Sequence, residues 1–229
     1  MAAAAPSPKP LSRRFFATDP ETLARKLLGC TLARTLPDGS RLAGTIVETE
    51  AYLGIPDTSS HTHGGRRTER VASMWARPGT LYVYFTYGMH YCMNISAGAE
   101  GDPVAVLIRA IEPTEGLGLF RAHRAGTRPR KKPLNDRELC SGPARLCQAL
   151  AIGRDHDGLD LTAGPVPGLG ALAVERRKTG PLTDDQIAVG PRVGLSGDDE
   201  WTHAPLRFAI AGSPYTSRPR LKTRLGDSV

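Results

Sequence analysis

The 229-residue chain lacks several features that mark whole classes of protein. No apolar run approaches the ~18 residues that a membrane-spanning helix needs, so we expect no membrane contact. The opening stretch MAAAAPSPKPLSRR has no continuous apolar segment, which argues against a secretory signal peptide. The four cysteines include no CxxC pair, and this pattern indicates reduced, buried thiols in an intracellular protein.

Lysine is absent from residues 46–109, although Lys and Arg together number 30 against 23 acidic residues. This segment therefore offers no side-chain amine as a nucleophile. It holds instead carboxylates, imidazoles, aromatic rings and a guanidinium. The net charge of +7 and the pI near 9.5 favour a polyanionic partner. Together these groups suit stacking on a flat base beside an activated water.

Strand patterns dominate the chain. RLAGTIVETEAYLG alternates in polarity, two β-rich arms at 81–87 and 90–96 flank Gly88-Met89, and 104–111 is apolar on both faces. Helix signals surround these strands without a regular strand–helix alternation, and we find no internal repeat. We therefore predict an α+β fold: a single domain with a curved, largely antiparallel β-sheet, surrounding helices and a protruding β-hairpin.

The domain limits follow from composition. Residues 1–12 form an Ala/Pro-rich arm that we expect to be disordered, and residues 13–215 form the folded domain. Residues 216–229 are predicted to be a basic, flexible tail, and the charged stretch 121–137 a mobile loop. A charged run is usually only a solvated surface, but a basic chain also makes phosphate contact a reasonable alternative.

Two glutamates on one expected strand are the strongest candidates for chemistry. Side chains two residues apart share a strand face, so Glu48 and Glu50 point the same way. One reading is a structural ion pair with an arginine. The other makes Glu50 a general base that deprotonates a water, with Glu48 as structural support. Arg109, alone in the apolar run VAVLIRAI, must be paired if it is buried.

Histidines raise the question of a metal. His61 and His63 could bind a metal together with Glu50 or His90, but HExxH and the HxE…PCxxC signature of zinc deaminases are absent. We therefore predict no metal and no cofactor. The alternatives for His61 are an ordinary loop histidine or a residue that lines a base pocket.

The aromatic residues fit a base as well as a core. Tyr52 and Tyr84 suit stacking on a base. Tyr87 is expected at the hairpin tip, where a buried role is least favoured and insertion into a duplex is possible. Asn94 is polar within an otherwise apolar strand, so it either bonds a neighbouring turn or reads a base edge.

Five motifs together carry a family resemblance: IVETEAYLG, SSHTHGGR, PGTLYVYFTYGMHYCMNIS, VLIRAIEP and ELCSGPARLCQALAI. The chain resembles the alkyladenine DNA glycosylase (3-methyladenine DNA glycosylase) family from about Phe15 to Tyr215. The resemblance implies Glu50 as the general base and Arg109 as a residue that holds the nucleophilic water.

The remaining implied roles concern the DNA. Tyr52, His61 and Tyr84 would wall the flipped base, and Asn94 would crowd the exocyclic amine of guanine. Tyr87 would fill the gap in the duplex. The implied DNA contacts are Arg66, Met89 and His90. His90 departs from the tyrosine that the family resemblance leads us to expect at this position, beside Tyr87.

The implied function is a monofunctional glycosylase that acts as a monomer on double-stranded DNA with damaged purines. Hydrolysis of the N-glycosidic bond of 3-methyladenine or 7-methylguanine would start base excision repair, and hypoxanthine and etheno-adenine are further candidates. We expect it on chromosomal DNA, in the nucleoid of a bacterium or the nucleus of a eukaryote. A non-catalytic DNA-binding module and a metal-dependent hydrolase remain alternatives.

Overall fold

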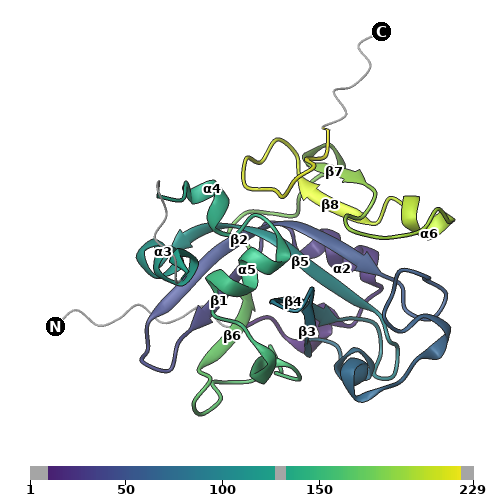
Figure 1. The fold of residues 1–229 in the computed structure, drawn as a ribbon, viewed down its shortest axis with the longest axis horizontal. Coiled ribbons are helices and arrows are strands. Elements are labelled where there is room, and N and C mark those ends of the chain that lie inside the picture. Colours follow the sequence, from purple (N-terminus) through teal and green to yellow (C-terminus); the bar gives the residue numbers. More distant parts are fainter. Residues whose placement is uncertain (1–9, 127–132, 223–229) are drawn as a thin grey trace, which may run out of the picture.

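The computed structural model describes residues 10–126 and 133–222 and folds them around one eight-stranded antiparallel sheet (Figure 1). The strands run in the order β3-β4-β5-β2-β1-β6, and β8 and β7 continue the sheet beside β2. The strands are β1 (Thr31–Thr35), β2 (Arg41–Tyr52), β3 (Leu81–Thr86), β4 (His90–Ser96), β5 (Ala105–Glu115), β6 (Ala171–Glu175), β7 (Ile187–Gly190) and β8 (Arg207–Ile210). The predicted α+β domain is confirmed.

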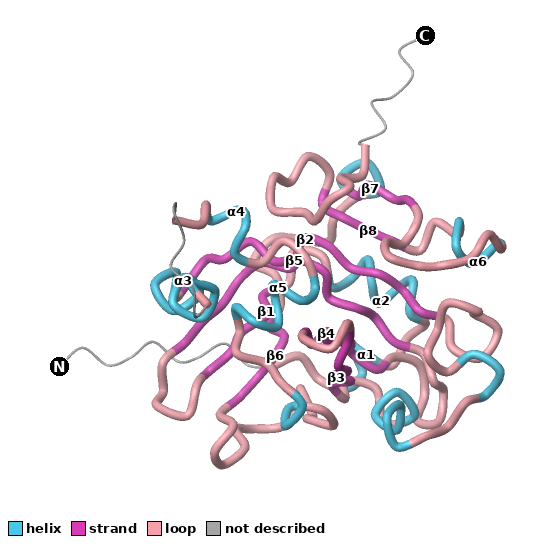
Figure 2. The backbone as a smooth tube through the Cα atoms, in the orientation of Figure 1, coloured by secondary structure: helices cyan, strands magenta, loops and turns pink. Residues whose placement is uncertain are grey.

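Helices cover both faces of the sheet. In Figure 1, α2 lies behind β2 and β5 and packs against both, and α5 lies on the front of the sheet, where it packs against β4 and β5. The α-helices are α1 (Arg13–Phe16), α2 (Pro20–Leu27), α3 (Leu117–Ala125), α4 (Asp136–Leu139), α5 (Pro143–Ala149) and α6 (Glu200–His203). The 3-10 turns are η1 (His63–Gly65), η2 (Glu69–Trp75), η3 (Arg154–His156) and η4 (Asp184–Gln186). Figure 2 shows that the chain between β2 and β3 runs mostly as loop.

Local signals explain α2. The Asp19 carboxylate accepts a hydrogen bond from the Thr22 backbone N–H, which satisfies a free donor of the first turn. Pro20 follows at the first helical position, where its missing N–H costs nothing. Leu23 and Leu27, four residues apart, both lie in the core. The start of the helix is thus set by its local sequence.

The β3–β4 hairpin projects from the edge of the sheet. Its arms pair from Leu81 with Ile95 to Thr86 with His90. At the tip, Tyr87 is 80% exposed and Met89 is 69% exposed. Because the base of the hairpin is buried and the tip is not, the predicted protruding hairpin is also confirmed.

The predicted mobile loop at 121–137 is wrong over part of its length. Helix α3 includes residues 121–125, because Phe120 and Arg124 of this helix are buried and tie it to the domain. Helix α4 begins within the same stretch. Residues 127–132 lie outside the described residues.

Both predicted domain limits need correction. Leu11 lies in the hydrophobic core, and its backbone N–H bonds the Val174 carbonyl at 2.8 Å, so the fold includes part of the predicted arm. At the other end, Ser217 is buried inside the domain although its sequence context is basic and polar. The rest of the arm, at 1–9, and of the tail, at 223–229, lies outside the described residues.

Candidate active site

Glu50 lies near the end of β2, between β5 and β8, and its side chain is fully buried. Its Oε1 accepts the backbone N–H of Val193 at 2.8 Å and lies 3.1 Å from Nη1 of Arg109. Its Oε2 accepts the hydroxyl of Tyr52 at 3.0 Å. The carboxylate is therefore held from three directions.

Glu48, two residues before Glu50 on the same strand, lies at the centre of a second buried cluster. Its Oε1 lies 2.6 Å from Nε of Arg207 and 3.3 Å from Nε of Arg109. Ser217 donates its backbone N–H to Oε2 at 2.6 Å and its hydroxyl to Oε1 at 2.9 Å. Both glutamates thus reach Arg109, as their shared strand face predicts, and both are ion-paired.

Register irregularities on both sides of Glu48 leave this shared face intact. The pairing of β2 with β5 shifts before and after Glu48, yet Glu50 opposite Leu107 continues the register of Ile46 opposite Ile111. The two shifts therefore cancel. A net slip of one residue would have turned Glu50 to the α2 side of the sheet.

Burial raises the pKa of the Glu50 carboxyl above its ordinary value. Arg109, the Val193 N–H and the Tyr52 hydroxyl lower it again in part, and the charge of Glu48 raises it further. Burial lowers the pKa of Arg109, but Glu50 and Glu48 outweigh that effect and raise it. The site therefore combines a permanent cation with a carboxylate that is more basic than usual.

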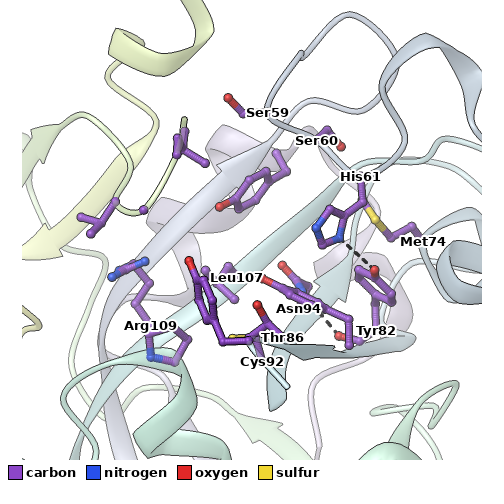
Figure 3. A pocket seen from close by; sticks show the side chains of 17 residues that line it. Ser59, Ser60, His61, Met74, Tyr82, Thr86, Cys92, Asn94, Leu107 and Arg109 are labelled. Atoms are coloured by element: carbon purple, nitrogen blue, oxygen red, sulfur yellow. Dashed lines mark hydrogen bonds between the residues drawn. The ribbon is translucent and has the colours of Figure 1, made fainter. Parts of the chain in front are cut away.

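A cavity of about 340 Å³ opens beside this cluster (Figure 3). Its size lies within the ~300–1,000 Å³ that is typical of small-ligand sites. The cavity brings together six of the predicted site residues: Tyr52, His61, Tyr84, Tyr87, Asn94 and Arg109. Glu50 lies directly behind Tyr52 and Arg109, which contact both it and the cavity.

Aromatic rings form one wall of the cavity. The His61 ring meets Tyr84 edge to face at 4.6 Å between centroids, and Tyr82 stacks on Tyr84 at 5.4 Å. The Tyr82 hydroxyl lies 2.9 Å from Nδ1 of His61, as drawn in Figure 3. Burial lowers the pKa of His61, and the charges of Arg70 and Arg66 lower it further. A neutral imidazole at pH 7 follows.

Tyr52 is fixed by two charged groups. Its hydroxyl bonds Glu50, and the guanidinium of Arg192 lies 4.7 Å from its ring centroid. Arg192 is itself held by both carboxylate oxygens of Asp57, at 2.6 and 2.9 Å, and this pair is fully buried. The cation covers one face of the Tyr52 ring.

Asn94 points into the cavity from β4 (Figure 3). Its Nδ2 donates to the Tyr82 carbonyl on β3 at 3.4 Å. One alternative for Asn94 predicts a hydrogen bond to a neighbouring turn. The observed partner is instead the facing strand of the hairpin. Because that bond is long, the amide remains available to a ligand in the cavity.

The residues predicted to intercalate into or contact DNA lie on the surface, and among them Tyr87 also lines the cavity. Tyr87, Met89 and His90 are exposed at the hairpin tip, and Arg66 is exposed after η1. Tyr87 has φ +50°, an uncommon conformation for a residue other than glycine. Gly88 also has positive φ, and the Met89 N–H bonds the Thr86 carbonyl, as in a type I′ turn.

Several contributors were missed in the sequence, including Arg207 at Glu48 and the Arg192–Asp57 pair at Tyr52. Val193 and Ser217 contact the two glutamates from segments with no periodic pattern, so no local signal marks them. Tyr82 had a signal, because residues two apart share a strand face and Tyr84 was already a candidate. Its hydroxyl is the partner of His61.

Two findings concern metals and membranes. Among the residues that the structure describes, no group of three or more His, Cys, Asp and Glu side chains could hold a metal ion. In the same part of the chain, no helix is long and apolar enough to cross a membrane.

Comparisons with known proteins identify the family of the chain. A family model described as methylpurine-DNA glycosylase matches residues 14–214. DNA-3-methyladenine glycosylase from Homo sapiens is 48% identical over 211 residues, which cover 90% of this chain and 67% of the human one. The Mus musculus protein of the same name is 46% identical over 212 residues, 90% of this chain and 61% of its own length.

The chain thus spans somewhat under two thirds of the mouse relative and about two thirds of the human one. A relative from Streptomyces avermitilis is 44% identical over 223 residues, which cover 96% of each chain. The family model and these relatives extend over nearly all described residues, including both glutamates, the cavity and the hairpin. This chain belongs to the methylpurine-DNA glycosylase family.

Proposed function

We propose that this chain is a monofunctional DNA glycosylase that flips a damaged purine out of duplex DNA and hydrolyses its N-glycosidic bond. It acts as a monomer without a cofactor. Its substrates are 3-methyladenine and 7-methylguanine, with hypoxanthine and etheno-adenine as further candidates. The observation that carries this proposal is a fully buried carboxylate, Glu50, directly behind an aromatic cavity of suitable size.

The reaction needs one base and charge stabilisation. Glu50 takes a proton from a water, whose oxygen attacks C1′ as the bond to the purine nitrogen breaks. The electron pair of that bond leaves with the base. An alkylated purine is already cationic, so it departs neutral without a protein acid. The Glu50 carboxylate also stabilises the positive charge that develops on the sugar.

The two oxygens of Glu50 have different roles. Oε1 is occupied by the Val193 N–H and by Arg109. Oε2 has only the Tyr52 hydroxyl as a donor within the described residues. A carboxylate oxygen accepts about two hydrogen bonds, so the proton of the attacking water goes to Oε2. Arg109, which lines the cavity, orients that water from the other side.

The cavity walls select the base. Tyr52, His61 and Tyr84 stack around it, and Asn94 crowds the 2-amino group of guanine. Because Arg192 already covers one face of Tyr52, that ring has less attraction left for a cationic purine. Tyr84 is therefore the stronger source of cation–π stabilisation.

The hairpin tip opens the duplex. Tyr87 adopts positive φ in a tight turn, and its ring is exposed. Because the ring does not contribute to the core, this conformation supports a binding role. Its ring replaces the flipped base in the stack. Met89 and His90 beside it, together with Arg66, contact the DNA.

A single-turnover panel of duplexes, each with one defined lesion, tests the proposal. We expect free base and an intact abasic strand, in the presence of EDTA and without an adduct after borohydride. Residues 46–109 contain no lysine, so no side-chain amine there can form a trapped Schiff base. Inhibition by EDTA would support a metal-dependent hydrolase, and a trapped adduct a lyase. Binding without excision would support a non-catalytic module.

A further inference from the structure

The segment that follows β8 returns to the ionic cluster behind the cavity. Ser217 is buried there and contacts both members of the Glu48–Arg109 pair. Its hydroxyl donates to Oε1 of Glu48 at 2.9 Å and accepts from Arg109, with Nε at 3.3 Å and Nη2 at 3.2 Å. A hydroxyl has one proton to donate and two lone pairs to accept, so this geometry uses its full capacity.

Arg207 and the main chain hold Ser217 in place. The Ser217 N–H bonds Oε2 of Glu48 at 2.6 Å. Arg207 bonds Glu48 through Nε, and its Nη2 donates to the carbonyls of Pro219 at 2.7 Å and Ser217 at 3.4 Å. The segment is therefore tied to the sheet on both sides of the hydroxyl, and loss of the hydroxyl alone need not release it.

The nitrogens of the Arg109 guanidinium contact two different groups of residues. Nη1 meets Glu50, whereas Nε and Nη2 meet Ser217 and, through Nε, Glu48. A guanidinium is planar, so fixing Nε and Nη2 also fixes the direction of Nη1. Among the described residues, the Ser217 hydroxyl is the hydrogen-bond acceptor of Nη2. Loss of the hydroxyl therefore leaves Nη2 without this acceptor.

We infer that Ser217 is a positioning residue for the hydrolytic centre, because its hydroxyl fixes the Arg109 guanidinium on Glu50. This inference rests on the proposed function of Glu50 as the general base. Arg109 lowers the pKa of Glu50 against the larger effect of burial. A loosened Arg109 therefore raises the pKa of Glu50, and the base becomes protonated at a higher pH.

The test compares Ser217→Ala with Ser217→Thr, which keeps a hydroxyl. Ser213→Ala is the matched control: its hydroxyl accepts the Tyr215 N–H in the same segment, and no bond joins it to Glu48 or Arg109 within the described chain. Single-turnover excision of a fixed lesion is measured across pH. Affinity for an uncleavable lesion duplex and the Tm are measured in parallel.

For Ser217→Ala we expect about tenfold slower excision at neutral pH, consistent with one lost charge-assisted hydrogen bond. The acid limb of its pH–rate profile should move to higher pH, with duplex affinity unchanged. Ser217→Thr and Ser213→Ala should keep the wild-type profile. An Ala variant with the wild-type rate and acid limb would overturn the inference, and so would a Thr variant that fails like Ala.

A second measurement does not depend on activity. The pKa of Glu50 can be read from the 13C chemical shift of its carboxyl in the wild type and in Ser217→Ala. A rise in the variant supports the inference, and an unchanged value overturns it. If Ser217→Ala does not fold, Ser217→Cys is measured in its place. The backbone N–H of residue 217 still bonds Glu48 in this variant, and the thiol forms only weak hydrogen bonds with Glu48 and Arg109. Wild-type protein that excises no lesion would instead overturn the proposed function.

Discussion

The carboxylate of Glu50 and the ring of Tyr87 are held in opposite ways. Three donors fix Glu50 at 2.8 to 3.1 Å, and no part of its side chain is exposed. Tyr87 is 80% exposed, and its direction depends on a tight backbone turn. One group is fixed by long-range side-chain contacts and the other by local backbone geometry.

The difference teaches where function and stability are linked. Removing one member of a buried ionic cluster leaves its partners charged and uncompensated, so folding and chemistry change together. An exposed ring can be replaced with little effect on folding. Mutations near Glu50 should therefore have mixed effects, and mutations at the tip should affect binding alone.

Glu50→Gln should have the largest effect on the reaction. An amide cannot take a proton from water, and general bases contribute ~10²–10⁴-fold to rates. We expect excision to fall by at least that factor, while affinity for a lesion duplex stays within about tenfold of the wild type. Single-turnover kinetics and a binding titration measure the two effects. Substantial residual cleavage would move the base role to Glu48 or elsewhere.

Glu48→Gln should sharpen the contrast within the buried region. The substitution removes the carboxylate charge that pairs with Arg109 and Arg207. Breaking a buried ion pair costs ~3–5 kcal/mol. We expect a large fall in the free energy of unfolding in a denaturant titration. Glu50→Gln in the same titration is the comparison. Equal stability of Glu48→Gln and wild type would show that this cluster is not a structural support.

Tyr87→Asn tests the exposed hairpin tip. Asparagine suits the positive-φ position before Gly88, so the turn should persist and the Tm should not fall. The lost ring removes stacking worth ~1–3 kcal/mol, and lesion affinity should weaken accordingly. A fluorescent base at the lesion site reports flipping. If its signal in Tyr87→Asn equals that of the wild type, Tyr87 is not the wedge.

Asn94→Ser acts where the two regions meet, since Asn94 is on the return strand of the hairpin and opposite Leu107 of β5. A shorter side chain makes room for a 2-amino group. Filling or opening such a space changes discrimination by about tenfold or more. We expect guanine-type bases to be excised faster relative to hypoxanthine. Unchanged discrimination in an active variant would remove this role from Asn94.

Arg66→Gln should give the smallest effect. Each phosphate contact contributes ~0.9 to the slope of log affinity against log salt. We expect the slope for non-specific duplex to fall by about one, with lesion excision at saturating enzyme unchanged. Arg13→Gln, near Pro78 and Asp160 rather than the cavity, is a control. Equal slopes for Arg66→Gln and wild type would return Arg66 to the solvated surface.

The sequence by itself determined the family and much of the secondary structure, but not the helices within the stretch 121–137 that was predicted to be a loop. The Asp19-Pro20 start of α2, the alternation of β2 and the two arms of the hairpin are local patterns, and local patterns follow from backbone preference and side-chain periodicity. The order of the motifs from Glu50 to Arg109 was enough to indicate the family. The same order named six residues that the fold brings to the cavity.

Only the tertiary structure decided what holds the two glutamates. Val193 is 143 residues from Glu50 along the chain, and Ser217 is 169 residues from Glu48. Composition marked the segment around Ser217 as a flexible tail, because it is low in apolar residues and rich in basic ones. The buried Glu48 carboxylate orders that segment through hydrogen bonds to Ser217. Which distant groups satisfy a buried charge depends on the packing of the whole sheet, and no local pattern records it.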